Sequence, residues 1–103
     1  MFIEKFIEYL QIEKNYSENT LSAYNNDLKE FQVFINENYD KCNIEEVEYK
    51  IVRSWIVCLV NKNLSNRSIN RKFSSLKSFY SFLVKIYTIN SSPLLAHIKL
   101  KQS

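Results

Sequence analysis

Two arginines and two serines recur at helical spacing in the second half of the chain. Arg67 and Arg71 are four residues apart, and Ser74 and Ser78 continue the same series. At about 100° per residue these side chains share one face of a helix, which also includes Lys85. A guanidinium group can bind a phosphate, or the O6/N7 edge of guanine, through two hydrogen bonds. Because this face carries no acid, its composition is typical of a surface that binds a polyanion.

The apolar residues of the same segment predict the helix that positions this face. They recur along the opposite side, at Ile69, Phe73, Leu76, Tyr80, Leu83 and Tyr87. Ser65 is a favourable N-cap, and Pro93 disfavours helix just before it, so we expect a helix from residue 65 to about 89. Its first backbone N–H groups offer a further anion site, and the amide of Asn70 can pair with adenine.

Charge is divided unevenly between the two halves of the chain. Residues 1–50 hold all eleven acids against five lysines, a formal charge of −6, whereas residues 51–103 hold nine lysines or arginines and no acid. This asymmetry favours a nucleic acid as the partner of the second half. The alternative is that the acidic half packs against the basic half.

Composition excludes several classes of protein. The chain has 103 residues, no glycine and one proline, which argues against hairpin-rich β folds and excludes a glycine loop for phosphate. Turns that need positive φ must then use asparagine. No segment is apolar enough to span a membrane, and the opening residues do not form a signal peptide. Cys42 and Cys58 lack metal-site spacing, so we expect no metal and a reduced, cytoplasmic setting.

The residues also fail to supply a catalytic constellation. His97 is the only histidine, and it follows the last predicted helix. The acids Glu45 and Glu46 have no nucleophile or base near them in sequence, and the serines of the basic helix have no local base. A nucleophilic tyrosine needs a cationic clamp around the phosphate, which a single histidine makes hard to build. We therefore expect no catalytic residues, no cofactor and no small-molecule substrate.

The remaining apolar patterns predict three more helices. They cover residues 2–14, residues 17–37 with Ser17 as N-cap, and residues 43–61, where Asn43 and Glu46 have the spacing of a capping box. Cys58 is expected to face inward, and Phe82 and Ile86 lie off the main apolar stripe of the last helix, where they can meet a neighbouring helix. Four helices joined by short loops indicate an all-α bundle.

Two segments resemble a known family. Residues 17–28, SENTLSAYNNDL, resemble the S-x-x-T-L-x-x-Y-x-x-D-L pattern in the second helix of tyrosine recombinases of the phage integrase family. Residues 65–83, SNRSINRKFSSLKSFYSFL, are similar to the fourth helix of that family. The resemblance is to the N-terminal core-binding domain, a SAM-like orthogonal bundle of four to five helices. Residues 1–90 would form this domain, and 91–103 would begin a linker.

The resemblance implies that the second and fourth helices hold duplex DNA while protomers assemble on it. By position, the contact surface comprises Asn19, Thr20, Ala23, Asn26, Arg67, Asn70, Arg71, Ser74, Ser75 and Ser78. Tyr24 and Asp27 would be structural. The residues that cleave and rejoin DNA in the family belong to a C-terminal domain, outside this sequence.

Two other interpretations stay open from the sequence. One is a helical protein-interaction module, and the other is a stand-alone DNA-binding regulator, suggested by the turn at residues 61–63 before a basic helix.

Overall fold

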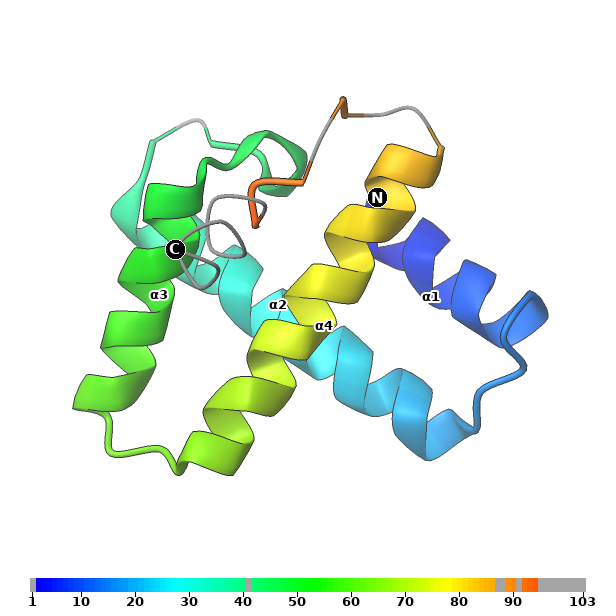
Figure 1. Cartoon of the computed structure of the whole chain (residues 1–103), viewed down its shortest axis with the longest axis horizontal. Helices are drawn as coiled ribbons and strands as arrows, with labels where there is room; N and C mark the ends of the chain where they lie inside the picture. Colours follow the sequence, from blue (N-terminus) through cyan, green and yellow to red (C-terminus); the bar gives the residue numbers. More distant parts are fainter. Residues whose placement is uncertain (1, 41, 87–88, 91, 95–103) are drawn as a thin grey trace, which may run out of the picture.

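The computed structural model describes residues 2–40, 42–86, 89–90 and 92–94. This part of the chain is all helical and contains no strand. Its elements are α1 (Phe2–Ile12), α2 (Glu18–Asn38), a short 3-10 helix η1 (Ile44–Glu46), α3 (Tyr49–Asn61) and α4 (Asn66–Lys85). α4 crosses α2 near the middle of the molecule, with α3 and α1 on opposite sides of the crossing (Figure 1). The predicted all-α bundle is confirmed.

The predicted N-caps of α2 and α4 are confirmed. The Ser17 Oγ accepts a hydrogen bond from the Thr20 backbone N–H at 3.3 Å, and the Ser65 Oγ accepts one from Ser68 N–H at 3.2 Å. Each hydroxyl satisfies a donor that has no partner within its helix. Local sequence therefore determines where both helices begin.

Asparagine takes the place of glycine in two turns, as predicted. Asn15 has φ of 53° and Asn63 has φ of 62°, both in the left-handed region. Asn15 follows α1 and Asn63 follows α3, where the chain reverses toward the next helix. Asparagine tolerates this region better than other residues with a Cβ.

The predicted start of the third helix at Asn43 is wrong. The Asn43 side chain makes no capping hydrogen bond, and only the three residues of η1 follow it before the chain extends again at Val47. The backbone is extended at both Val47 and Glu48, and the Ile44 carbonyl accepts a hydrogen bond from the Tyr80 hydroxyl of α4, so contacts with α4 hold this segment outside a continuous helix. α3 begins only at Tyr49.

The ends of two helices also differ from expectation. α1 ends at Ile12, and α4 ends at Lys85 with Ile86 as its C-cap. Tyr87, expected on the apolar stripe, lies outside the described residues, as do His97 and most of the predicted linker. Of that linker, Leu94 is 2% exposed and belongs to the core. Packing therefore continues beyond residue 90, while the boundary itself stays a prediction.

α4 buries a wider arc than one apolar stripe because it packs against α1, α2 and α3. Phe79 and Phe82 are buried beside the predicted stripe, and Phe73 is only half-buried. The Phe82 ring lies 5.4 Å from the Phe6 ring and 4.9 Å from the Tyr9 ring, so it packs inside the bundle on α1. The wider arc displaces the exposed face of α4 from the position that the stripe alone predicts.

Tyr80 joins α4 to the loop before α3. Its side chain is fully buried, and its hydroxyl donates a hydrogen bond of 2.6 Å to the Ile44 carbonyl. Burial, followed by the nearby Cys42 and Glu45, raises the pKa of the Tyr80 hydroxyl well above its ordinary value. The group therefore stays protonated and keeps donating.

Candidate nucleic-acid interface

The exposed face of α4 carries cations and small polar side chains along its length. Its exposed or half-buried members are Arg67, Asn70, Arg71, Ser74, Lys77, Ser78, Ser81 and Lys85. No acid from α4 itself interrupts this face, which we call the α4 polar face. Lys77 and Ser81 were missed by the sequence argument because the apolar stripe placed the centre of the exposed side too close to Arg71.

Ser75 does not belong to the α4 polar face. It was predicted to contact DNA, but its side chain is buried with 4% exposure, and its hydroxyl donates to Asp27 Oδ2 at 2.8 Å. The residue faces α2 because α2 covers this side of α4. Ser75 therefore helps to hold the two helices together.

A buried carboxylate connects α2 to α4. Asp27 is 1% exposed, and its Oδ1 accepts hydrogen bonds from Arg71 Nη2 at 2.9 Å and from Lys72 Nζ at 3.2 Å. With the Ser75 hydroxyl on Oδ2, three side chains of α4 converge on one acid of α2. The structural role expected for Asp27 thus has a physical basis, since a buried charge is tolerated when it is paired and hydrogen-bonded.

The ion pairs at the α2–α4 crossing also bear on the alternative that the acidic half neutralises the basic half. Lys72 is buried between Asp27 and Glu30, so it is withdrawn from any external partner. Arg71 keeps 57% of its side chain exposed while one nitrogen binds Asp27. Arg67 has no acidic partner among the described residues. Ion pairs with α2 therefore remove Lys72 from the surface and orient Arg71.

The expected contact residues of α2 lie at its N-terminal half. Asn19, Thr20 and Asn26 are exposed, and Ala23 is half-buried. The Thr20 hydroxyl lies 3.1 Å from the Ser17 Oγ, within the capping arrangement. The N-terminal ends of α2 and α4 both lie at the lower edge of the molecule in Figure 1, so the positive ends of two helix dipoles share one edge.

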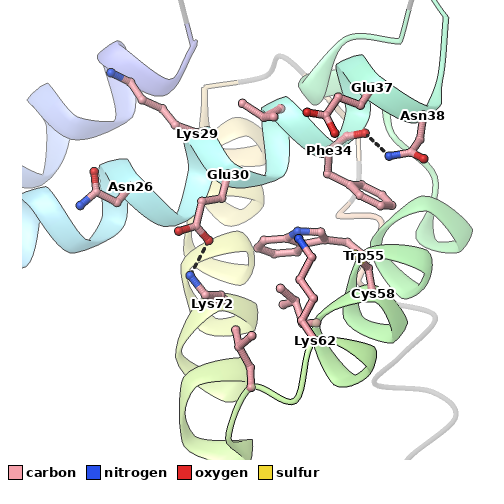
Figure 2. Close-up of a pocket in the computed structure, with 13 residues that line it drawn as sticks. Asn26, Lys29, Glu30, Phe34, Glu37, Asn38, Trp55, Cys58, Lys62 and Lys72 are labelled. Carbon is pink, nitrogen blue, oxygen red and sulfur yellow. Dashed lines mark hydrogen bonds and ion pairs between the residues drawn. The ribbon is translucent and has the colours of Figure 1, made fainter.

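A hollow of about 860 Å³ opens between α2, α3 and the start of α4. Figure 2 shows Glu30 and Glu37 of α2 on its rim, opposite Lys62, the C-cap of α3, with Trp55 on the apolar wall. The Lys72 side chain reaches Glu30 from α4. Because acids and bases both line this hollow, its charge does not match a polyanion as the α4 polar face does.

The described residues contain no group of three potential metal ligands among His, Cys, Asp and Glu. Cys42 and Cys58 are free, and burial, followed by the charges of Glu46, Glu45 and Glu48, raises the pKa of the Cys42 thiol. A raised pKa lowers the fraction of thiolate, the reactive form. No helix in the described part of the chain is long and apolar enough to cross a membrane.

Comparison with known proteins shows the family to which the chain belongs. Residues 3–86 match the family described as "Phage integrase, N-terminal SAM-like domain". This match covers α1 to α4. The chain belongs to the phage integrase N-terminal SAM-like domain family.

Curated tyrosine recombinases are similar to this SAM-like domain at substantial identity. Tyrosine recombinase XerC of Anoxybacillus flavithermus is 46% identical over 88 residues, which is 85% of this chain and 29% of the relative. The XerC of Listeria monocytogenes is 41% identical over 90 residues, 87% of this chain and 30% of the relative. That of Bacillus subtilis is 39% identical over 98 residues, 94% of this chain and 32% of the relative.

The chain therefore spans about 30% of the length of the curated relatives it matches. No solved structure matches the chain. The family resemblance found in residues 17–28 and 65–83 is confirmed, and those segments correspond to the start of α2 and most of α4.

Proposed function

We propose that this chain is a DNA-binding domain that holds duplex DNA for a tyrosine recombinase. The observation that carries the proposal is the α4 polar face, where Arg67 has no acidic partner in the described part of the chain and Arg71 is already oriented by Asp27. Membership of the phage integrase SAM-like family and the similarity to XerC recombinases support it. The chemistry of strand cleavage and rejoining would be carried out by residues outside this sequence.

The proposed contacts divide by the chemistry of each side chain. Arg67 and Arg71 bind phosphates or guanine edges, and Asn70 is suited to adenine in the major groove. Ser74 and Ser78 are small, so the helix can approach the DNA closely. On α2, Asn19, Thr20, Ala23 and Asn26 form the second contact surface, beside backbone N–H groups at the helix start.

Isolated binding by this domain should be weak and governed by charge. Few phosphate contacts give roughly micromolar or weaker affinity, and little of it depends on sequence. Other recombinase protomers on the same DNA would add affinity by assembling beside this domain. The protein-interaction function and DNA holding are thus compatible.

Arg67→Gln tests the proposal without disturbing the core, because Arg67 has no partner among the described residues. Removing one phosphate contact should make the log–log dependence of affinity on salt shallower by about 0.9. Lys50→Gln is the matched control, since Lys50 is an exposed lysine of α3 paired with Glu48. An Arg67→Gln salt dependence equal to that of Lys50→Gln would contradict a phosphate contact by Arg67.

A further inference from the structure

A basic groove lies between α1 and the C-terminal half of α4. It has a cavity volume of about 380 Å³, and three lysines line it: Lys14, Lys77 and Lys85. The other polar lining comes from Tyr9, Tyr16, Tyr24, Ser78 and Ser81, and no acid is among the described residues that line it. We call it the α1–α4 groove.

The three lysines are not neutralised within the described part of the chain. Each is exposed, and none forms an ion pair with a described carboxylate. Among these three, Lys85 alone has a side-chain partner in the part of the chain that the structure describes: its Nζ donates to the Tyr9 hydroxyl at 3.2 Å and lies 5.0 Å from the centre of that ring. Three ammonium groups around one groove repel each other, so an anion in the groove would be favoured.

Aromatic packing gives the groove firm walls. The Tyr16 ring stacks on the Tyr24 ring with centroids 6.0 Å apart, and Tyr24 packs edge-on against Phe6 at 5.8 Å. Phe82 fixes Tyr9 on the other side at 4.9 Å. The tyrosine hydroxyls can donate hydrogen bonds to phosphate oxygens.

The groove is continuous with the α4 polar face. Lys77, Ser78, Ser81 and Lys85 belong to both, and they extend the series that starts at Arg67. Lys77 and Lys85 follow Arg71 by six and fourteen residues, which is about 9 and 21 Å along the helix axis. The major groove of DNA is only about 12 Å wide. A helix whose N-terminal half lies in that groove therefore carries its C-terminal half to the sugar–phosphate wall.

We infer that the α1–α4 groove binds the phosphodiester backbone of the duplex whose major groove receives the start of α4. Lys77 and Lys85 bind phosphates, and Lys14 approaches the same strand from the segment between α1 and α2. This inference rests on the proposed DNA-binding function and extends it to a surface that includes α1.

The test is duplex binding by the 103-residue chain, measured by fluorescence anisotropy at 50 to 200 mM salt. Lys77→Gln/Lys85→Gln should make the log–log slope shallower by about 1.8, for two lost phosphate contacts. Between 50 and 200 mM salt, the fall in affinity of the wild type should then be roughly 12-fold larger than the fall in affinity of the variant. The matched control is Lys5→Gln/Lys50→Gln, which removes the same charge from two exposed lysines that do not line the groove.

A slope for Lys77→Gln/Lys85→Gln equal to that of the control overturns the groove assignment. If Arg67→Gln still lowers the slope in that case, the proposed DNA-binding function stands while the groove fails. Absence of wild-type binding at 50 mM salt overturns both.

Amide chemical shifts of the wild-type domain give a second measurement that needs no substitution. Saturating duplex should shift residues 77–85 and Tyr16 as well as residues 66–74. Shifts confined to residues 66–74 would overturn the groove assignment.

Discussion

Asp27 is the residue on which the contact between α2 and α4 depends. It binds Arg71, Lys72 and Ser75 at once, at distances of 2.8 to 3.2 Å, while almost fully buried. The sequence argument assigned Asp27 a structural role from its place in a family pattern. It could not identify the partners, because they lie 44 to 48 residues away and are paired only by the crossing of the two helices.

Asp27→Asn should lower the free energy of unfolding by about 3 kcal/mol, as expected when one partner of a buried ion pair is removed. The substitution keeps the size of the side chain but leaves the buried Lys72 ammonium with less compensation. Urea unfolding monitored by circular dichroism measures the change. Glu30→Gln is the control, because Glu30 also binds Lys72 but is 53% exposed, and it should cost less than about 1 kcal/mol. Equal losses for both variants would refute the central role of Asp27.

Tyr80→Phe should reveal a dependence of stability on alkaline pH. At pH 8 the variant loses the hydrogen bond to the Ile44 carbonyl, which costs about 1 to 2 kcal/mol. In the wild type, the pKa of buried Tyr80 is raised, whereas the unfolded chain ionises this tyrosine near pH 10. Proton release then favours the unfolded wild type as pH rises above 10, so its stability advantage should shrink by about 1.4 kcal/mol at pH 11. Unfolding of both proteins at pH 8 and 11 measures this difference, and a constant difference would be inconsistent with a buried hydroxyl.

At the scale of elements, N-cap residues in the sequence correctly predicted where two helices begin. Ser17 and Ser65 cap α2 and α4 as expected. The same type of signal failed at Asn43, because the chain is extended at Val47 and Glu48 and the Ile44 carbonyl is bound by Tyr80, which lies 36 residues away in sequence. Periodicity likewise underestimated the buried arc of α4, since a single apolar stripe cannot show that three helices surround it.

Comparing two potential caps tests this distinction. Ser65→Ala should destabilise the domain by about 1 kcal/mol, since the N–H of Ser68 loses its acceptor. Asn43→Ala should change stability by less than about 0.5 kcal/mol, because the Asn43 side chain makes no capping bond. Thermal or urea unfolding of the two variants provides the comparison. A larger loss for Asn43→Ala would contradict the capping arrangement described for these helices.

At the scale of the whole molecule, the fold divides the basic residues into two groups: some are neutralised by acids inside the molecule, and others stay exposed on its surface. Part of the acidic half meets the basic half at the α2–α4 crossing, where Lys72 is neutralised. Arg67, Arg71, Lys77 and Lys85 remain exposed on α4. Net charge predicted an anion-binding half, but it could not distinguish internal lysines from external ones, because that distinction requires the helix crossing.

The most direct test of DNA holding is the salt dependence of duplex binding by the wild-type chain. Fluorescence anisotropy at several salt concentrations between 50 and 200 mM gives the slope of log affinity against log salt. Three to five phosphate contacts predict a slope between about −2.7 and −4.5. A slope near zero, or no binding at 50 mM salt, would contradict the assignment of α2 and α4 as a DNA-binding surface.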